Sequence, residues 1–406
     1  MTEKIAKPHL RFAGFDDTWE QRKVGELLIE RNEQAPMNEE YPLMAFIANE
    51  GVAPKGERYD RSSLVTDTEN KLYKRTEFGD FIYSSNNLET GSIGLNKYGK
   101  ACISPVYSIF HPTGIADSNF LGRRLVRKDF INSMVKWRQG VIYGQWRIHE
   151  SDFLKIEISV PSVKEQRQIG TFLDYLDNLI TLHQRKYDKL TNVKKSMLEK
   201  MFPKNGSNVP EIRFKGFSDA WEQRKVFELA EKTYGGGTPA TSNEAFWNGN
   251  IPWIQSSDIL DGKLFGVEPR KHITQEGLNN SATQLVPENS IAIITRVGVG
   301  KLAFMPFSYT TSQDFLSLSK LNTEPFFTVY ACYKKLQSEL NAVQGTSIKG
   351  ITKDELLAKI IMVPKYAEQQ KIGVFFKQLD TLITLHQREL EKLKNLKKAC
   401  LEKMFV

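Results

Sequence analysis

The chain has 406 residues, of which 40% are hydrophobic and 11% aromatic, so its composition is that of a soluble globular protein with two or three domains. Its formal net charge of +8 suits an acidic partner such as nucleic acid. With no run of about eighteen apolar residues, no apolar core near Met1 and three cysteines without disulfide or zinc-ligand spacing, we expect a cytoplasmic protein without a membrane span or signal peptide.

The first element is a short stub that occurs twice. Residues 8–24 and 210–226 are identical at 12 of 17 positions, and both copies end in Trp-Glu-Gln-Arg-Lys-Val. The second copy follows a turn at residues 203–207, where proline and Asn-Gly are expected to end a helix. We therefore assign residues 1–24 and 210–226 to two equivalent stubs.

Each stub leads into an insert of domain size, residues 25–160 and 227–363. Both inserts contain short strand-like runs between Gly, Pro and Asn, at residues 78–85, 102–110, 290–295 and 301–304. Helical patterns occur near residues 128–138 and 325–340. We predict that both inserts are mixed α/β domains. Their unlike sequences on a shared frame indicate that each insert recognises a different target.

Each insert is followed by a long helical segment, residues 161–209 and 364–406. Residues 161–202 and 364–405 are identical at 25 of 42 positions, and Leu179–Arg185 returns unchanged as Leu382–Arg388. Apolar residues three and four apart form a narrow stripe on each segment, which predicts that the two helices pack together as a coiled coil. Two ordinary core helices of separate domains are the alternative. The residues expected in this packing are Leu179, Leu182, His183, Leu382, Leu385 and His386.

The helical segments also carry the excess charge. Residues 164–204 and 365–406 each contain nine lysines and arginines against five aspartates and glutamates, so the rest of the chain is neutral. This excess fits a solvated lysine-rich helix face, or a surface near nucleic acid or an acidic partner.

The order stub, insert, helix, stub, insert, helix is a cycle cut open. The chain ends at Val406, where a second turn would begin, and it starts with the stub that would follow that turn. We expect a pseudo-twofold arrangement in which the N-terminal stub docks near the end of the second helix. The predicted fold class is α+β, with two mixed α/β domains separated by a pair of long antiparallel helices.

Four features together resemble the specificity subunit of type I restriction-modification systems over nearly the full length of the chain. One is the cyclic duplication, and another is the pair of junctions in which Val160-Pro161 and Val363-Pro364 precede the long helices. The others are the opening Gly235-Gly236-Gly237-Thr238-Pro239 with Trp247–Ile254, and Thr295–Lys301 with Ser312-Gln313. The first insert lacks the Gly-Gly-Thr-Pro opening, so it resembles a more divergent recognition domain.

This resemblance implies a division of labour. The inserts would be target recognition domains that each read one half of a bipartite site in double-stranded DNA, and the helices would set the gap. Two modification subunits, which hold S-adenosylmethionine and methylate adenine, and two restriction subunits, which use ATP and Mg²⁺, would bind this chain. The chain itself would hold no cofactor and perform no chemistry.

Tests for catalytic motifs agree with that expectation. The Asn/Asp-Pro-Pro-aromatic motif of adenine methyltransferases is absent. Residues 298–301 are similar to a phosphate loop, but Thr295 replaces its first glycine and Leu302 replaces its Ser/Thr. The repeat equates His183 with His386, and we favour packing or register specification over a metal site for this pair.

If the inserts bind DNA, lysines and arginines would supply affinity through phosphates, and side chains at base edges would supply specificity. Arg296 lies in a glycine-flanked loop after a strand and suits guanine, while Gln313 suits adenine. The predicted DNA-binding residues are Asn86, Asn87, Lys97, Lys100, Arg123, Arg124, Tyr143, Gln145, Arg296, Lys301, Ser312, Gln313 and Lys349.

Two other functions fit parts of the sequence. A stand-alone two-headed DNA-binding protein, such as a repressor, would also need two unlike readers on one frame. A scaffold that binds only protein is favoured by the neutral inserts, because DNA readers usually carry a basic surface.

Overall fold

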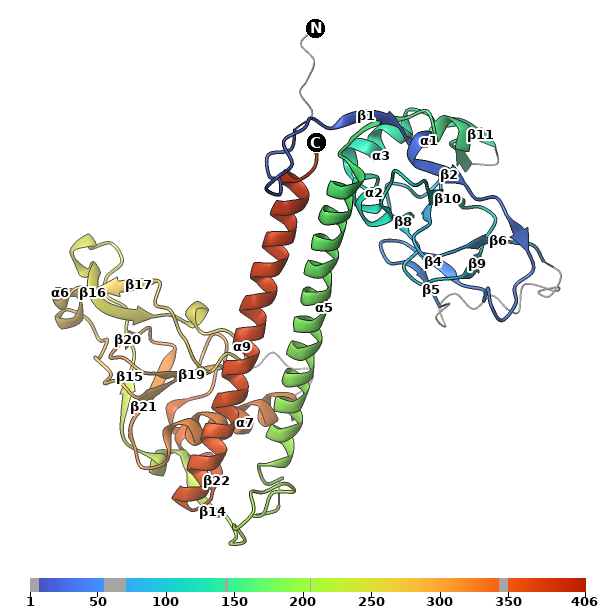
Figure 1. The fold of residues 1–406 in the computed structure, drawn as a ribbon. Coiled ribbons are helices and arrows are strands. Elements are labelled where there is room, and N and C mark those ends of the chain that lie inside the picture. The colour runs from blue at the N-terminus through green and yellow to red at the C-terminus, as the bar shows by residue number, and fades with distance from the viewer. Residues whose placement is uncertain (1–6, 55–70, 143–144, 205, 343–349) are drawn as a thin grey trace. The chain divides into compact units, whose positions relative to one another are not determined.

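The computed structural model describes residues 7–54, 71–142, 145–204, 206–342 and 350–406. The chain forms two compact units (Figure 1). The first unit combines the residues up to His183 with Glu389–Val406, and the second unit is Gln184–Arg388. Each unit therefore contains one stub, one insert and a part of both long helices.

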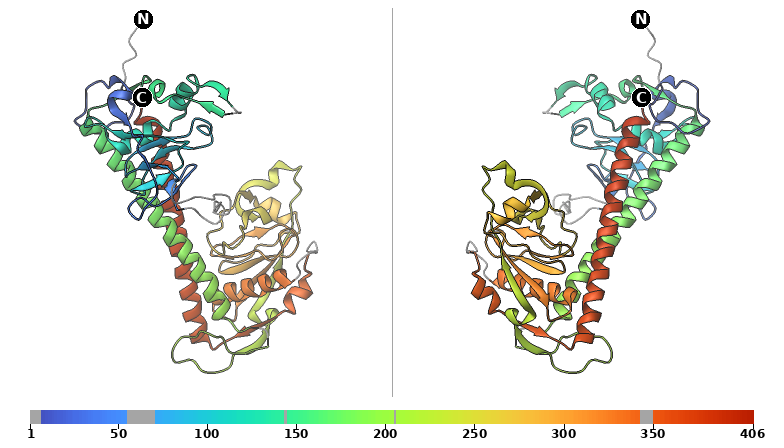
Figure 2. Two further views of the ribbon diagram at one scale, coloured as in Figure 1. Left: turned by 90° about the vertical axis from the view of Figure 1, so that its right-hand side faces the viewer. Right: turned by 90° about the vertical axis from the view of Figure 1, so that its left-hand side faces the viewer.

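The long helices are α5 (Val163–Lys200) and α9 (Tyr366–Lys403), each of 38 residues. In the first unit Asp177 of α5 pairs with Lys397 of α9 at 2.5 Å, and in the second Lys194 of α5 pairs with Asp380 of α9 at 2.5 Å. Residue numbers thus rise along one helix as they fall along the other, so the helices are antiparallel. Both helices can be followed in Figure 2, α5 in green and α9 in red. The predicted fold class is confirmed.

The first unit is built on a four-stranded antiparallel sheet of order β2-β10-β7-β8. Its strands are β2 (Leu28–Glu30), β7 (Phe81–Tyr83), β8 (Ile93–Leu95) and β10 (Ser108–Pro112). Smaller sheets join β3 (Gln34–Ala35), β6 (Tyr73–Thr76) and β9 (Ala101–Ile103), then β4 (Ala45–Ile47) with β5 (Gly51–Ala53), and β11 (Gln139–Ile142) with β12 (Gln145–Arg147). The short helices are α2 (Ser118–Arg124), α3 (Lys128–Val135) and α4 (Glu150–Phe153).

The second unit has a four-stranded antiparallel sheet of order β15-β21-β18-β19. Its strands are β15 (Ala230–Gly235), β18 (Ser290–Ile294), β19 (Leu302–Met305) and β21 (Phe315–Leu321). A second sheet joins β16 (Trp247–Ile254), β17 (Lys271–Ile273) and β20 (Thr310–Thr311). The helices are η4 (Glu244–Phe246), η5 (Ser256–Asp258), α6 (Gln275–Asn279), α7 (Pro325–Ala342) and α8 (Lys353–Leu357).

The stubs join the inserts to the long helices in the same way in both units. Strand β1 (Glu20–Lys23) pairs with β13 (Glu157–Val160), and β14 (Glu222–Lys225) pairs with β22 (Ile360–Val363). A single helical turn follows each stub strand, α1 (Val24–Leu27) and η3 (Val226–Leu229). The stub amides also reach helix ends, since Leu10 N donates to Lys403 O at 2.8 Å and Ile212 N donates to Lys200 O at 2.9 Å. The N-terminal stub thus meets the end of α9, as the cyclic repeat predicts.

A trio of aromatic rings seals each of these junctions. In the first unit, Trp19 of the stub packs edge-on against Phe120 and against Phe405, with centroid distances of 5.7 and 6.5 Å. The equivalent rings in the second unit are Trp221, Phe327 and Phe202, which lie within 5.9 Å of each other. All six side chains are buried, and such aromatic pairs add about 0.5–1.5 kcal/mol each beyond the buried area. The trios explain why the stub tryptophan recurs.

The two four-stranded sheets correspond strand by strand, although the insert sequences are unlike. Leu28 and Ala230 hold the same place after the stubs, and they pair with Pro112 and Leu321. Counting back four residues makes Ser108 equivalent to Ser317, and these pair with Tyr83 and Ala292. Hydrophobic cores under both sheets can be built from different residues of similar volume, so topology persists where sequence identity does not.

Candidate nucleic-acid interface

Three loops of the second insert meet at one end of its four-stranded sheet. They are residues 235–239 after β15, 295–301 between β18 and β19, and 312–314 before β21. Thr295 N and Thr295 Oγ1 both donate to Asp314 O, at 2.8 and 3.0 Å. Ile351 N in turn donates to Thr295 O at 2.7 Å. The backbone therefore fixes these loops relative to one another.

Close packing requires two of the three glycines of the first loop, Gly236 and Gly237. An added Cβ at Gly236 would lie 1.8 Å from Ser312 O, and one at Gly237 would lie 2.5 Å from Thr283 N. Gly237 N donates to Thr311 O at 2.8 Å, which holds the loop against the strand that precedes Ser312. The lack of a side chain at Gly236 and Gly237 thus allows the backbone of this loop to pack directly against residues 283 and 312.

The loops line an open cleft of about 910 Å³ that also includes residues 350–353. Arg296 and Gln313, two of the predicted DNA-binding residues, line this cleft and are exposed. Thr238 Oγ1 donates to Gln313 Oε1 at 2.6 Å, which orients the amide. Val297, which the sequence analysis did not select, also lines the cleft and is 71% exposed. The cleft therefore presents a guanidinium, an amide and an apolar group, the three chemistries that read base edges.

Two other predicted DNA-binding residues of this insert, Ser312 and Lys301, are less exposed than Arg296 and Gln313. Ser312 is only 5% exposed, and its hydroxyl lies 3.5 Å from Asp314 Oδ2. Lys301 is half-buried at the end of the turn. Gly298 and Gly300 adopt φ of 93° and 90°, and the turn links antiparallel strands β18 and β19. A phosphate loop instead joins a strand to a helix, so this turn is not one.

The first insert has an equivalent loop at residues 84–92. Because Tyr83 and Ala292 share one register position, Asn87 occupies the position of Arg296. Asn86 and Asn87 are exposed, whereas Leu88 is fully buried and anchors the loop. The backbone of Asn87 is held at both ends, since its N–H donates to Ser84 O at 3.2 Å and its carbonyl accepts from Ser92 N at 2.9 Å. Asn86 and Asn87 therefore lie at the end of the first-insert sheet that corresponds, by register, to the cleft end of the second-insert sheet.

The predicted cations of the first insert are instead engaged by carboxylates. Lys97 pairs with Asp174 at 2.9 Å, and Arg123 pairs with Asp174 and Asp177 at 2.7 and 2.8 Å. Arg124 is 7% exposed and pairs with Asp129 at 2.8 Å. The side chains of Arg123 and Arg124 are only 12% and 9% exposed and serve the packing of the unit, so we do not retain them among the candidate DNA contacts. The sequence hid this role because Asp174 and Asp177 lie on α5, far along the chain. The Lys97 side chain is 53% exposed and stays a prediction.

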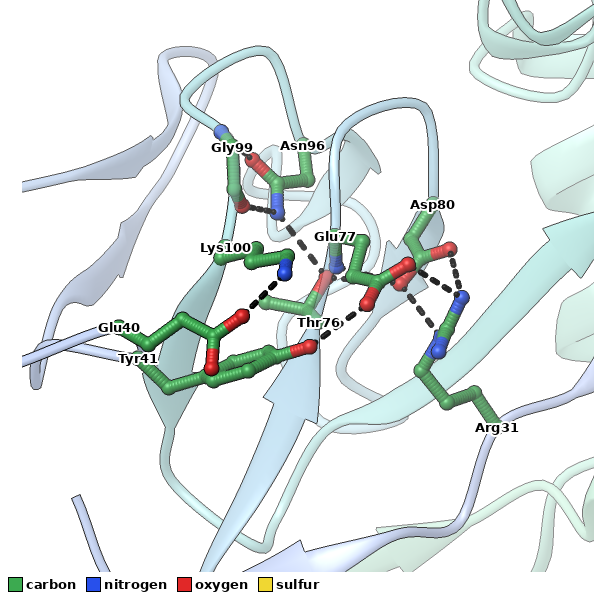
Figure 3. Close-up of polar contacts among 9 residues, drawn as sticks. All are labelled: Arg31, Glu40, Tyr41, Thr76, Glu77, Asp80, Asn96, Gly99 and Lys100. Atoms are coloured by element: carbon green, nitrogen blue, oxygen red, sulfur yellow. Dashed lines mark hydrogen bonds and ion pairs between the residues drawn. The ribbon is translucent and has the colours of Figure 1, made fainter. Parts of the chain in front are cut away.

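Lys100 belongs to a polar network around Tyr41 (Figure 3). Its ammonium pairs with Glu40 and lies 5.5 Å from the centre of the Tyr41 ring. Tyr41 Oη donates to Glu77 Oε1 at 2.6 Å, and this hydrogen bond lowers the pKa of Glu77 and raises that of Tyr41. The network holds the loop that carries Lys100.

The same network continues to a buried carboxylate. Asp80 is 1% exposed and pairs with Arg31 at 2.9 Å, and burial raises its pKa although these partners oppose the shift. Thr76 Oγ1 donates to Asp80 and accepts from Asn96 Nδ2, both at 3.1 Å. Asn96 Nδ2 also donates to Gly99 O at 2.7 Å. The turn before Lys100 is therefore rigidly braced, which is a structural role.

The remaining predicted residues divide into two groups. Tyr143, Lys349 and the side chain of Gln145 lie outside the described residues. On the long helices, Leu179, His183 and His386 are half-buried, but Leu182, Leu382 and Leu385 are 47%, 43% and 51% exposed. Leu182 and Leu385 each precede a half-buried histidine by one residue, about 100° around the helix, so they leave the packed stripe. The corrected packing set keeps Leu179, His183 and His386 and leaves out the exposed Leu182, Leu382 and Leu385.

Within the described parts of the chain, no helix is long and apolar enough to cross a membrane. The same residues contain no group of three or more His, Cys, Asp or Glu that could hold a metal ion.

Two sheets of one topology, each ending in an exposed polar loop and mounted on a shared helical frame, define a two-domain recognition protein. The model of the type I restriction modification DNA specificity domain matches the chain twice, over residues 16–192 and 218–395. The chain therefore belongs to the type I restriction-modification DNA specificity family.

Known proteins agree with this assignment. The type I restriction enzyme EcoR124I/EcoR124II specificity subunit of Escherichia coli is 32% identical over 174 residues, which are 41% of this chain and 43% of that protein. The MjaIX specificity subunit of Methanocaldococcus jannaschii is 27% identical over 180 residues, 43% of this chain and 41% of that protein. The matched part of the chain thus spans less than half the length of either relative. A crystal structure of a type I restriction-modification S subunit from M. genitalium has the same fold, with a TM-score of 0.61 at 14% identity over 98% of this chain and 99% of that one.

Proposed function

We propose that this chain is the DNA specificity subunit of a type I restriction-modification complex. Residues 25–160 and 227–363 are its target recognition domains, and each reads one half of a bipartite site. The observation that carries the proposal is the equivalence of the two sheets, because both end in an exposed loop with base-reading side chains while the loop sequences differ. Two readers on one topology suit a site with two unlike halves.

The chemistry of each loop suggests what it reads. Arg296 has the planar donor pair that matches O6 and N7 of guanine, and Gln313 beside it can pair with adenine. Asn87, at the register position of Arg296, has the amide that matches adenine N6 and N7. Such a bidentate contact discriminates by roughly 1–3 kcal/mol against the wrong base.

The chain contributes no chemistry in this proposal. Two modification subunits bring S-adenosylmethionine and methylate adenine, and two restriction subunits bring ATP and Mg²⁺. Support for two copies of one partner comes from identical side chains that are exposed in both repeats. Glu20, Gln21 and Lys23 are exposed like their counterparts at 222, 223 and 225, and Leu182 is exposed like Leu385. The repeat thus offers such a partner one equivalent surface in each unit.

The helix pair acts as a ruler between the half-sites. Insertion of four residues after Tyr187 and four after Leu390 would lengthen the pair by about 6 Å, near two base pairs of DNA. Sequencing of methylated sites in cells that carry the complete system should then show a wider gap between unchanged half-sites. An unchanged gap would contradict the ruler.

Exchange of one insert tests the proposal as a whole. Replacement of residues 25–160 by the corresponding insert of another family member should change one half of the methylated site and leave the other half unchanged. Co-purification separates this function from a stand-alone repressor. A specificity subunit should carry a methyltransferase with it, whereas a repressor should bind a defined operator alone with steep salt dependence.

A further inference from the structure

Each insert rests on a long helix through one short helix of its own, α2 on α5 and α7 on α9. The first point of contact lies at the start of the short helix. Gln166 Oε1 accepts from Asp117 N at 3.0 Å, and Gln369 Oε1 accepts from Glu324 N at 2.9 Å. The repeat makes these glutamines equivalent, so both inserts dock at the same place on the frame.

One turn further along, a glycine lets the backbones meet. An added Cβ at Gly170 would lie 3.2 Å from Phe120 N, and one at Gly373 would lie 2.8 Å from Phe327 N. The glutamine and the glycine are four residues apart and share a helix face. This face receives the first turn of the docking helix. Buried apolar side chains of the two helices belong to one core around it, Phe120 with Leu173 in the first unit and Tyr330 with Phe376 in the second.

In the first unit a further polar contact, at Asp177, adds direction to this apolar packing. Asp177 Oδ2 accepts from Arg123 Nη2 of α2 at 2.8 Å, and Asp177 Oδ1 pairs with Lys397 of α9 at 2.5 Å. One carboxylate therefore ties the insert to both long helices. Arg123 is 12% exposed and also pairs with Asp174 at 2.7 Å, so its guanidinium is held firmly in place.

The second unit repeats this arrangement with one different partner. Asp380 Oδ1 pairs with Lys194 of α5 at 2.5 Å, and Asp380 Oδ2 accepts from Tyr330 Oη of α7 at 2.6 Å. Tyr330 is fully buried, and burial together with the charge of Asp380 raises its pKa above the ordinary range of tyrosine. Arg123 and Tyr330 each lie three residues after the equivalent rings of Phe120 and Phe327.

The frame thus supplies an identical aspartate and lysine at both docks, and each insert supplies its own hydrogen-bond donor. We propose that Asp177 and Asp380 are positioning residues that hold each recognition domain at a fixed orientation on the helix pair, with Arg123 and Tyr330 as the domain-specific donors. The inference rests on the proposed function, because a fixed orientation matters where two readers must match half-sites at one spacing. It extends that function by naming the residues that set the orientation.

The chemistry of the carboxylate explains why aspartate is needed. Each of its two oxygens accepts from a different element, and the short side chain holds both donors close to the helix. Asparagine has one acceptor oxygen, and its amide group would point donors at a lysine or at a second donor. Asp→Asn variants therefore lose one of the two bridges while the volume of the side chain is kept.

The two docks also differ in exposure. The side chains of Asp177 and Lys397 are 32% and 31% exposed, whereas those of Asp380 and Lys194 are 16% and 13% exposed. Salt screens exposed pairs more than buried ones, so the Asp177–Lys397 pair between α5 and α9 should weaken before the Asp380–Lys194 pair as ionic strength rises.

The test compares Asp177→Asn and Asp380→Asn with two charge-matched controls, Asp188→Asn and Glu391→Gln. Both control carboxylates are exposed positions of the same helices. Tyr330→Phe removes one hydroxyl and is the mildest variant, and Arg123→Lys keeps a donor and should restore part of what Arg123→Met loses. Each variant is made in the full chain and purified with its co-expressed partner subunits.

The first readout is hydrogen exchange. Amides of α2 should exchange about tenfold faster in Asp177→Asn, and those of α7 about tenfold faster in Asp380→Asn and Tyr330→Phe, with each effect confined to one unit. The second readout is binding to duplexes that the wild-type protein selects from a random library, with the gap varied by one base pair. The variants should bind the altered gaps roughly tenfold better relative to the selected gap.

The outcomes separate the possibilities. Exchange and gap preference equal to those of the two controls would overturn the inference. Faster exchange with an unchanged gap preference would reduce the aspartates to structural residues and would also overturn it. If the wild-type protein selects no bipartite duplex, the proposed function fails, while the exchange data still decide whether the aspartates fix the docks.

Discussion

Replacement of Arg213 by methionine should destabilise the second unit severely. Arg213 of the stub forms two hydrogen bonds with Glu368 at the start of α9, from Nε to Oε1 at 2.7 Å and from Nη2 to Oε2 at 2.8 Å. The side chains are 13% and 1% exposed. Loss of the guanidinium would leave a buried carboxylate without its counter-charge, which costs about 3–5 kcal/mol.

Such a cost is large compared with the total stability of a unit. Domains are stable by about 5–15 kcal/mol, so the variant should lose roughly a fifth or more of its free energy of unfolding. For a unit of this size the melting temperature should fall by roughly 6–20 °C. Urea unfolding followed by tryptophan fluorescence should detect the loss, because Trp221 lies buried in the same junction.

The same stub provides a control. Arg224 pairs with Glu222 at 2.9 Å, but their side chains are 41% and 71% exposed, so Arg224→Met should change stability by less than about 1 kcal/mol. The double variant Arg213→Met/Glu368→Leu should recover most of the loss, because it removes the buried charge together with its partner. An effect of Arg213→Met no larger than that of Arg224→Met would refute this reasoning.

Four further experiments, on Gly373, Arg296, Asp177 and Cys332, have definite expected results. Gly373→Ala should cost about 1–3 kcal/mol in urea unfolding, because its Cβ would lie 2.8 Å from the backbone atom Phe327 N, and a neutral result would contradict the close approach of the two helices. Arg296→Ala should relax specificity at one base of one half-site by roughly 1–3 kcal/mol in competition binding, and a uniform loss over all sequences would indicate a phosphate contact instead. Burial would raise the pKa of Asp177, but its pairs with Lys397 and Arg123 outweigh burial and hold that pKa below its usual range. The ionised Asp177 therefore stabilises the fold fully above the pKa of the unfolded chain, and this stabilisation is lost as pH falls through the pKa of the folded state. The stability difference between wild type and Asp177→Asn should shrink between about pH 5 and pH 3. Burial raises the pKa of Cys332 to about 12, so iodoacetamide at about pH 8 should label it only after unfolding, which mass spectrometry would show.

The frame of the molecule could be predicted from the sequence because it is written twice. The identical Trp-Glu-Gln-Arg-Lys-Val segments became equivalent strands, and the repeated helical segments became helices of equal length. Register was harder, since a stripe with a spacing of 3.5 drifts on a straight helix of 3.6 residues per turn. Leu182 and Leu385 were therefore placed in the packed stripe although they are exposed.

The candidate site was only partly accessible from the sequence. Glycine and a preceding strand pointed to Arg296, and a polar loop pointed to Asn87, but their equivalence follows from strand pairing that unlike sequences conceal. Arg123 was taken for a DNA contact, and the ion pair of Lys97 was missed, because a sequence shows a charge without its partner. Asp174 lies about 50 to 80 residues further along the chain and reveals itself only when α5 packs against the insert.

Residues before and after the C-terminal end of β18 differ in how freely they can be substituted. Ile291 to Ile294 are at most 1% exposed and bonded to neighbouring strands, so substitutions there are constrained by folding. Arg296 and Val297, two and three residues beyond the strand, are exposed and line the cleft. Mutations at these two positions can therefore accumulate at little thermodynamic cost. A lineage under pressure to recognise new targets could explore many of them while the scaffold that presents the loop is inherited intact.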